Sequence, residues 1–403
     1  MPAASLSLTR PYLTDDHQPL QQQIQDIVNT QIAPLAPQME ERGPHTDREV
    51  RRMLSETGWL GVLLGPDEDG MDAGHVVKTW MLAEVARRSA AASAILQASI
   101  LGAAPIAEFG DEAMRRDWLP DIAAGRIWPT IATTEPVAGS HVLGMETTAH
   151  RKGQCFVLNG EKDLVGNADL GDVHCVIART GKRPGAKSLT AFLVEKNTPG
   201  LEVVRRPLNG LHGFSADGLR LSSVHVPRTR VIGEIGDGLA VALLSSVVYG
   251  RLNLAAVALG IHQRLLDVTK EWVSTRPRYK GHLSDLPPVR NRIAEMQGQL
   301  MSAQLAAYHA AYLLDEGIPC DAELIYSKLT SHRAGVASAE HAKQLHGGHA
   351  GRLGNPCEQL RRDMDLVHAP AGPDDLQLIR LAEQALGPSR TQWSARHLSH
   401  RHR

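Results

Sequence analysis

Three long stretches of the chain differ in how apolar and polar residues alternate. From Gln18 to about Arg126, apolar residues recur at three- and four-residue spacing, as in "QQQIQDIVNTQIAPLA" and "REVRRMLSETGWLGVLL". This period places one face of a helix against a core, and Gly and Pro separate the segments. The pattern predicts an N-terminal helical domain, which we bound at residues 1–128.

Short β-branched runs replace the helical pattern between about Ile131 and Val231. Runs such as "CFVLNGEK", "DVHCVIART" and "LTAFLVE" are bounded by turn residues, and the first contains an Asn-Gly turn. Runs of this length and composition are typical of β-strands. We therefore expect a β-barrel-like middle domain over residues 129–235.

The helical period returns after residue 235. Between Val289 and Leu314 apolar residues alternate steps of four and three, and Gly317 stands where a C-cap is expected. Such a stripe needs a partner helix, so we expect a C-terminal four-helix bundle over residues 236–390 and an α+β fold for the whole chain. The tail, 391–403, is polar, basic and rich in His, and we expect it to be frayed. The stripe consists of Val289, Ile293, Met296, Leu300, Ala303, Ala307, Ala310 and Leu314.

Composition narrows the classes of partner. The 403 residues include 43 Lys plus Arg against 44 Asp plus Glu, so no charge field attracts nucleic acid or an anionic membrane. We find neither an apolar leader nor a run of about 18 uncharged apolar residues, and therefore expect a cytoplasmic protein. The His-rich tail is a weak metal pattern, and we predict no metal site. Reduced thiols without a disulfide are expected of the scattered cysteines Cys155, Cys175, Cys320 and Cys357.

Several motifs follow one another in a fixed order along the chain. "EFGDEAMRRDWLPDIAAGRIWPTIATTEPVAGSH" precedes "FVLNGEKDLVGNAD", "VHVPRTRVIGEIGDGL", "TRPRYKG" and "QLHGGHAGRLGNPCEQLRRD". Together with the helical, β and helical order, they resemble the acyl-CoA dehydrogenase family of flavoproteins over roughly residues 20–385. The resemblance implies that family's fold, FAD as cofactor, and an acyl thioester of CoA or of an acyl-carrier protein as substrate.

Two polar segments are identified as binding segments by this resemblance. In "TTEPVAGS", Thr134 and Ser140 correspond to residues that contact the flavin, and Ser140 also lies near the thioester carrier. Their hydroxyls suit a carbonyl-rich or anionic ligand, although the string taken alone is more typical of a β-turn. In "VVYGRLNLAAVALG", Arg251 corresponds to the arginine that contacts the carrier part of the substrate.

A second group implies cofactor binding across a subunit boundary. Arg276 corresponds to the arginine that holds the flavin diphosphate, for which a guanidinium fork is well suited. Gln344, Gly347 and Gly348 correspond to the segment that meets the adenine end of a neighbouring subunit's flavin. These residues, and the partner that the apolar stripe needs, lead us to expect a homodimer or homotetramer.

The two positions at which the family holds its catalytic base carry no acid in this chain. Aligned from Asp363, the common position falls on Ala371 in "VHAPAGPDDLQ", and the alternative one falls on Gly250. Because neither position holds an acid, we leave the catalytic residue unassigned. Loss of a general base lowers rates by about 10²–10⁴-fold, so we do not expect ordinary α,β-desaturation. Other titratable residues near these positions, for which structural roles are favoured, are Tyr249, His368, Asp374 and Asp375.

The resemblance also weakens around the expected flavin ring. The family's "WITN" is replaced by Leu164, Val165, Gly166 and Asn167, which removes an aromatic wall and a hydroxyl donor. Three hypotheses remain open. The chain is a divergent dehydrogenase-like flavoenzyme of a specialised biosynthetic pathway, a flavin-dependent monooxygenase on the same fold, or a flavin-free cyclase, lyase or inactive partner subunit.

Overall fold

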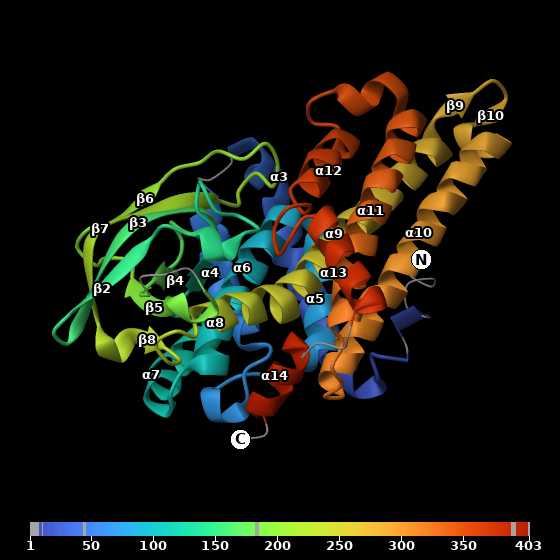
Figure 1. Cartoon of the computed structure of the whole chain (residues 1–403). Helices are drawn as coiled ribbons and strands as arrows, with labels where there is room; N and C mark the ends of the chain where they lie inside the picture. Colours follow the sequence, from blue (N-terminus) through green and yellow to red (C-terminus); the bar gives the residue numbers. More distant parts are fainter. Residues whose placement is uncertain (1–7, 10, 43–45, 182–184, 388–391, 402–403) are drawn as a thin grey trace.

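The computed structural model describes residues 8–9, 11–42, 46–181, 185–387 and 392–401. Figure 1 shows a sheet at one side of the molecule, long helices of the C-terminal half at the other, and α5 and α6 between them. The π-helix η2 (Val28–Ile32) joins α2 to α3. The N-terminal helices are α2 (Gln18–Ile27), α3 (Ala33–Arg42), α4 (Asp47–Ser55), α5 (Gly74–Arg88), α6 (Ala90–Phe109) and α7 (Glu112–Ala123).

Helix α6 runs through the centre of the molecule and is apolar on almost every side. Its N-cap, Ser89, accepts a hydrogen bond from the backbone N–H of Ala92, which satisfies one of the free donors of the first turn. The segments Ala90–Phe109 and Gly238–Thr275 are long and apolar enough to cross a membrane, which corrects our finding of no such run. Within the protein, 89% and 83% of their most apolar windows are buried, as expected of core helices.

The middle region forms one eight-stranded sheet in the order β6-β7-β3-β2-β4-β5-β8, with β1 beside β4. Neighbours are antiparallel except for the pairs β1–β4 and β2–β4. Inward-facing side chains of the sheet form a core of their own, in which the rings of Phe156 and Phe192 lie 5.1 Å apart. The strands are β1 (Pro129–Ala132), β2 (Thr148–Lys152), β3 (Cys155–Gly166), β4 (Val173–Arg179), β5 (Leu189–Glu195), β6 (Leu201–Val204), β7 (Ala216–Pro227) and β8 (Val231–Ile232).

The C-terminal region is built on three long helices. The apolar stripe of α10 is buried apart from the partly buried Ile293, and it packs against α9, α11 and the N-terminal α5 of the same chain. The partner of this stripe is therefore intramolecular, and the stripe does not support our expectation of an oligomer. The elements are α8 (Gly238–Leu244), the π-helix η9 (Ser245–Gly250), α9 (Arg251–Thr275), the hairpin β9–β10 (Pro277–Arg278 and Gly281–His282), α10 (Pro287–Asp315), α11 (Asp321–His346), α12 (Pro356–Asp365) and α13 (Asp374–Leu386).

The end of the chain is better ordered than the sequence indicated. Residues Trp393–Arg401 form α14, and Ser394 and His397 in it are buried. The Oγ atom of Ser394 donates to Asp321 Oδ1 at 2.6 Å, and the N–H groups of Trp393 and Ser394 bond the same carboxylate. The expected frayed tail is wrong for this segment, because Asp321 caps the helix and its polar side chains find partners inside the protein.

Candidate active site

A cavity of about 820 Å³ opens where the three regions of the chain meet. This volume lies in the range of sites for cofactors and small molecules. The walls come from α6, the segment after β1, the end of β3, the helices η9 and α9, and the loop of residues 367–373. Residues on these walls include Ala98, Thr134, Ser140, Leu164, Arg251 and Ala371.

Thr134 and Ser140, the residues expected to contact flavin, both line the cavity. They lie on a segment that a buried ion pair between Glu135 and Lys162 connects to β3. Lys162 Nζ lies 2.7 Å from Glu135 Oε1 and donates to the carbonyl of Thr133 at 3.1 Å. Burial of Lys162, opposed by Glu135, lowers the pKa of the lysine to about 8. Burial alone would raise the pKa of Glu135, but Lys162 and hydrogen bonds hold it below its usual value.

Arg251 begins α9 directly after the π-helix η9 and reaches the cavity wall. Arg251 is 7% exposed, and its buried Nε atom has no hydrogen-bond partner among the described residues. Burial lowers the pKa of Arg251 to about 10, partly offset by Asp321. Gln97 Oε1 and Ser245 Oγ, also in the cavity lining, are buried and have no hydrogen-bond partner within the described part of the chain. The wall therefore has unused polar atoms that a polar ligand can satisfy.

Gly250 and Ala371, the two residues that the sequence analysis aligned with the family's base positions, lie side by side. A Cβ atom placed on Gly250 would lie 3.1 Å from the Cβ atom of Ala371, and both residues line the cavity. Ala371 has a φ of 55°, a left-handed conformation that costs an alanine about 1–2 kcal/mol. Positions that are far apart in the sequence thus share one small patch of wall, and neither provides a proton acceptor.

Two buried residues that the sequence analysis missed hold the loop 367–373 in place. Lys328 Nζ donates to the carbonyls of His368 and Gly372 at 2.8 and 2.5 Å. Gln377 Nε2 donates to the carbonyls of Ala371 and Gly372 at 2.8 and 3.0 Å. Burial lowers the pKa of Lys328 to about 7. No local pattern marks these residues, because each is an ordinary polar position in a helix until the loop folds over it.

The titratable residues considered as replacements for the base do not reach the cavity. Tyr249 is buried and donates to Glu108 Oε1 at 2.5 Å. Asp374 accepts a 2.8 Å hydrogen bond from Arg333, and His368 faces Asp374. None of Tyr249, His368, Asp374 and Asp375 is among the cavity-lining residues.

Among the described residues, three carboxylates line the cavity, namely Asp321, Asp365 and Glu383. Asp321 is occupied as the cap of α14. Asp365 is exposed, and Glu383 pairs with Arg380 at 2.7 Å. We therefore assign none of them as the missing base.

The segment that replaces "WITN" divides between wall and core. Leu164, 57% exposed with a φ of 54°, and Gly166 line the cavity, whereas Val165 is buried in the core of the sheet. Asn167 is also buried, and its side-chain amide donates to the carbonyl of Ile95 at 2.7 Å and to Ser99 at 3.0 Å. Asn167, directly after β3, thus joins this strand to α6. Of the four residues in the segment, only Leu164 and Gly166 line the cavity.

The second group of predicted cofactor residues does not line this cavity. Arg276 follows α9 and lies over the ring of Trp272 at 4.7 Å, while Gln344, Gly347 and Gly348 are exposed near the end of α11. Trp272 connects the two segments, because its Nε1 donates to the carbonyl of Leu345 at 3.1 Å. One chain therefore presents the two predicted cofactor groups on separate surfaces.

Comparison with known proteins accounts for the order of the three regions. Residues 14–126, 130–224 and 236–386 match the N-terminal, middle and C-terminal domains of acyl-CoA dehydrogenases. An acyl-CoA dehydrogenase of Bacillus subtilis is 30% identical over 380 residues, which are 93% of this chain and 99% of that protein. A glutaryl-CoA dehydrogenase of Desulfococcus multivorans is 29% identical, with 93% and 97% covered.

Solved structures show the same relationship. A glutaryl-coenzyme A dehydrogenase in complex with glutaryl-CoA superposes with a TM-score of 0.88 at 29% identity, covering 93% of this chain and 96% of that one. The expected three-domain α+β fold is confirmed, and the comparisons support FAD as cofactor and oxidoreductase activity. The chain belongs to the acyl-CoA dehydrogenase family of flavoproteins.

Proposed function

We propose that this chain is a flavin-dependent oxidoreductase that binds an acyl thioester of CoA or of an acyl-carrier protein, and that it does not desaturate simple saturated acyl chains. Gly250 and Ala371, the two positions at which the family holds its base, meet at one patch of the cavity wall without a carboxylate.

The cavity fits a large polar cofactor. Thr134 and Ser140 present hydroxyls there, and Gln97, Ser245 and Arg251 have buried polar atoms that no described residue hydrogen-bonds. When bound, FAD supplies an acceptor or donor for hydride at an acyl carbon.

The remaining cofactor residues imply a contribution from a second subunit. Arg276, Gln344, Gly347 and Gly348 would hold the diphosphate and adenine parts of FAD in a neighbouring subunit. The exposed position of this surface in a single chain supports a homodimer or homotetramer.

The buried guanidinium of Arg251 favours a substrate that is negatively charged or rich in carbonyl groups. A buried cation without a hydrogen-bonded partner is costly in the free protein, and a ligand oxygen can compensate for that cost. Relatives named for their action on acyl-CoA and glutaryl-CoA are similar over almost the whole chain. The exposed Ser140 and the buried Arg251 would bind different parts of one extended thioester.

The missing base restricts the acyl group. The α-proton of a simple thioester has a high pKa, and its removal depends on a positioned acceptor. We infer that the natural acyl group carries a substituent that acidifies the departing proton, so that water can accept it. Flavin monooxygenation is the second candidate, since the apolar and exposed Leu164 replaces an aromatic wall that would shield the flavin.

The test compares the native protein with variants that return a carboxylate to the wall. Full-length protein is loaded with FAD, and flavin bleaching is followed anaerobically with short- and medium-chain acyl-CoAs. The variant Ala371→Glu restores the common position, and Ala369→Glu, on the same loop, is the matched control. We expect no bleaching by the native protein or the control, and slow bleaching by Ala371→Glu, because Leu164 and Gly166 still alter the flavin face.

Each outcome decides between the hypotheses. Rapid bleaching of the native protein would refute the proposal and show that another residue acts as base. Protein that retains no flavin after FAD addition would support the flavin-free alternative. Oxygen consumption with NADH and a flavin reductase, without anaerobic bleaching, would identify the monooxygenase.

A further inference from the structure

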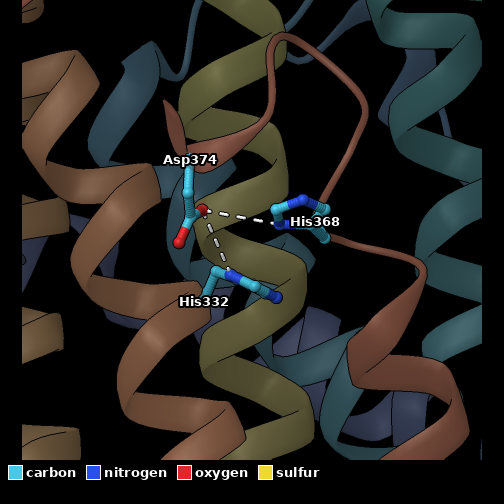
Figure 2. A group of neighbouring side chains, drawn as sticks. All are labelled: His332, His368 and Asp374. Atoms are coloured by element: carbon cyan, nitrogen blue, oxygen red, sulfur yellow. Dashed lines mark ion pairs between the residues drawn. The ribbon is translucent and has the colours of Figure 1, made fainter. Parts of the chain in front are cut away.

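A cluster of His332, His368 and Asp374 lies beside the loop 367–373 and outside the cavity lining. His332 belongs to α11, His368 to the loop, and Asp374 is the first residue of α13. Figure 2 shows both imidazole rings directed toward one carboxylate oxygen. The Nδ1 atoms of His332 and His368 lie 3.3 and 3.6 Å from Oδ1 of Asp374, and the three ligand atoms lie within 4.8 Å of one another.

These separations match ligands around an ion better than a direct charged pair. A charge-assisted N–H···O⁻ bond has a length of about 2.7–2.9 Å, shorter than either contact. Around a tetrahedral ion with bonds of about 2.0–2.1 Å, neighbouring ligand atoms lie about 3.3–3.4 Å apart. The two distances to Asp374 Oδ1, 3.3 and 3.6 Å, are closer to the second value, and the ligand nitrogens of the two imidazoles lie within 4.8 Å of each other.

The surroundings orient the three ligands. His332 is 7% exposed, and its Nδ1 atom is buried and faces Asp374 Oδ1 at 3.3 Å. The second oxygen of Asp374 accepts a 2.8 Å hydrogen bond from Arg333 Nε, which leaves Oδ1 facing the two imidazoles. Hydrogen bonds of this kind commonly fix metal ligands. The side chain of His368 is 45% exposed and offers a path for an ion from solvent.

We propose that His332, His368 and Asp374 bind one Zn²⁺ ion, which ties the loop 367–373 to α11. Two imidazole nitrogens and one carboxylate oxygen suit Zn²⁺, whereas Mg²⁺ and Ca²⁺ prefer sites made of oxygen. Three protein ligands leave the fourth position to water. Because the loop carries Ala371, the ion holds one wall of the cavity in place. The site is independent of the flavin chemistry proposed above.

Binding is measured on tag-free, full-length protein in which His400 and His402 of the tail are changed to Gln. After removal of metal with EDTA, calorimetric titration with Zn²⁺ is expected to give one ion per chain with a Kd below about 1 µM. His368→Ala and Asp374→Asn should each weaken binding by at least about 100-fold, since even second-shell changes cost about 10–100-fold. His309→Ala, at an exposed position of α10, is the matched control and should bind as tightly as the parent.

Two further readouts separate this site from adventitious binding. Co²⁺ in place of Zn²⁺ should give the visible absorption of four- or five-coordinate cobalt at wavelengths beyond the flavin bands, and His368→Ala should abolish it. Zn²⁺ should also slow amide exchange in residues 367–373. Absence of stoichiometric binding, or equal binding by His368→Ala and Asp374→Asn when both are folded by circular dichroism, would overturn the proposal. Unchanged exchange in the loop would overturn the tie to α11.

Discussion

Replacing Lys162 by Met removes the cation beneath the segment that carries Thr134 and Ser140. The side chains of Lys162 and Glu135 are 0% and 2% exposed, and their charged atoms lie 2.7 Å apart. Breaking a buried pair by removing one partner typically costs about 3–5 kcal/mol, because the other charge stays buried without compensation. The carbonyl of Thr133 also loses its donor. We expect Lys162→Met to lower the free energy of unfolding of the middle domain by at least about 3 kcal/mol.

The assay is amide exchange of β3 and β7, which reports the middle domain separately from the helices. Lys152→Met, an exposed lysine of β2, is the control and should change stability by less than about 0.5 kcal/mol. The double variant Lys162→Met with Glu135→Gln should regain part of the loss, since no buried charge remains. If this double variant is no more stable than Lys162→Met, the unpaired carboxylate of Glu135 is not the cause of the lost stability.

The free energies of unfolding of the native protein and of Lys162→Met should depend on pH in opposite directions. In the native protein the pKa of Glu135 is below its usual value of 4.5, so its stabilising contribution is present above 4.5 and is lost as pH falls through the folded pKa. Without Lys162, burial raises this pKa, and the remaining carboxyl destabilises the fold as pH rises above 4.5. The stability difference between native protein and Lys162→Met should therefore shrink on acidification.

Three further substitutions test other parts of the structure. Arg251→Met should weaken binding of acyl-CoA by about 10–100-fold, as expected from loss of a charged hydrogen bond. Thermal stability should not fall, because the buried Nε atom of Arg251 has no hydrogen-bond partner among the described residues of the free protein; a binding titration and a melting curve measure the two effects. Arg276→Ala should reduce the flavin retained after gel filtration while leaving the cavity intact, and full retention in an oligomer shown by light scattering would contradict its role. Asn167→Ala should cost about 2 kcal/mol in chemical denaturation, because the carbonyl of Ile95 and the hydroxyl of Ser99 lose the side-chain amide that bonds them and Ala disfavours a φ of 59°.

The order of helical, β and helical regions could be predicted from the sequence because periodicity is a local property. The stripe from Val289 to Leu314 marked the buried face of α10, and β-branched runs marked the strands of the sheet. Ordered motifs likewise placed Thr134, Ser140 and Arg251, and all three line the cavity. In each case a short segment contains enough information to define the element or the binding loop.

Tertiary packing decided what local patterns leave open. The α10 stripe could not show whether its partner lay in the same chain, and α14 is held in place by Asp321, which caps it, and by the contact of His397 with Glu108. The sequence showed that Gly250 and Ala371 lack an acid, but only folding brings them into contact. The cluster around Asp374 arises in the same way, since its ligands come from a helix, a loop and the start of the next helix. Such sites depend on distances between segments remote in sequence, and these distances are determined by the packing of the whole core.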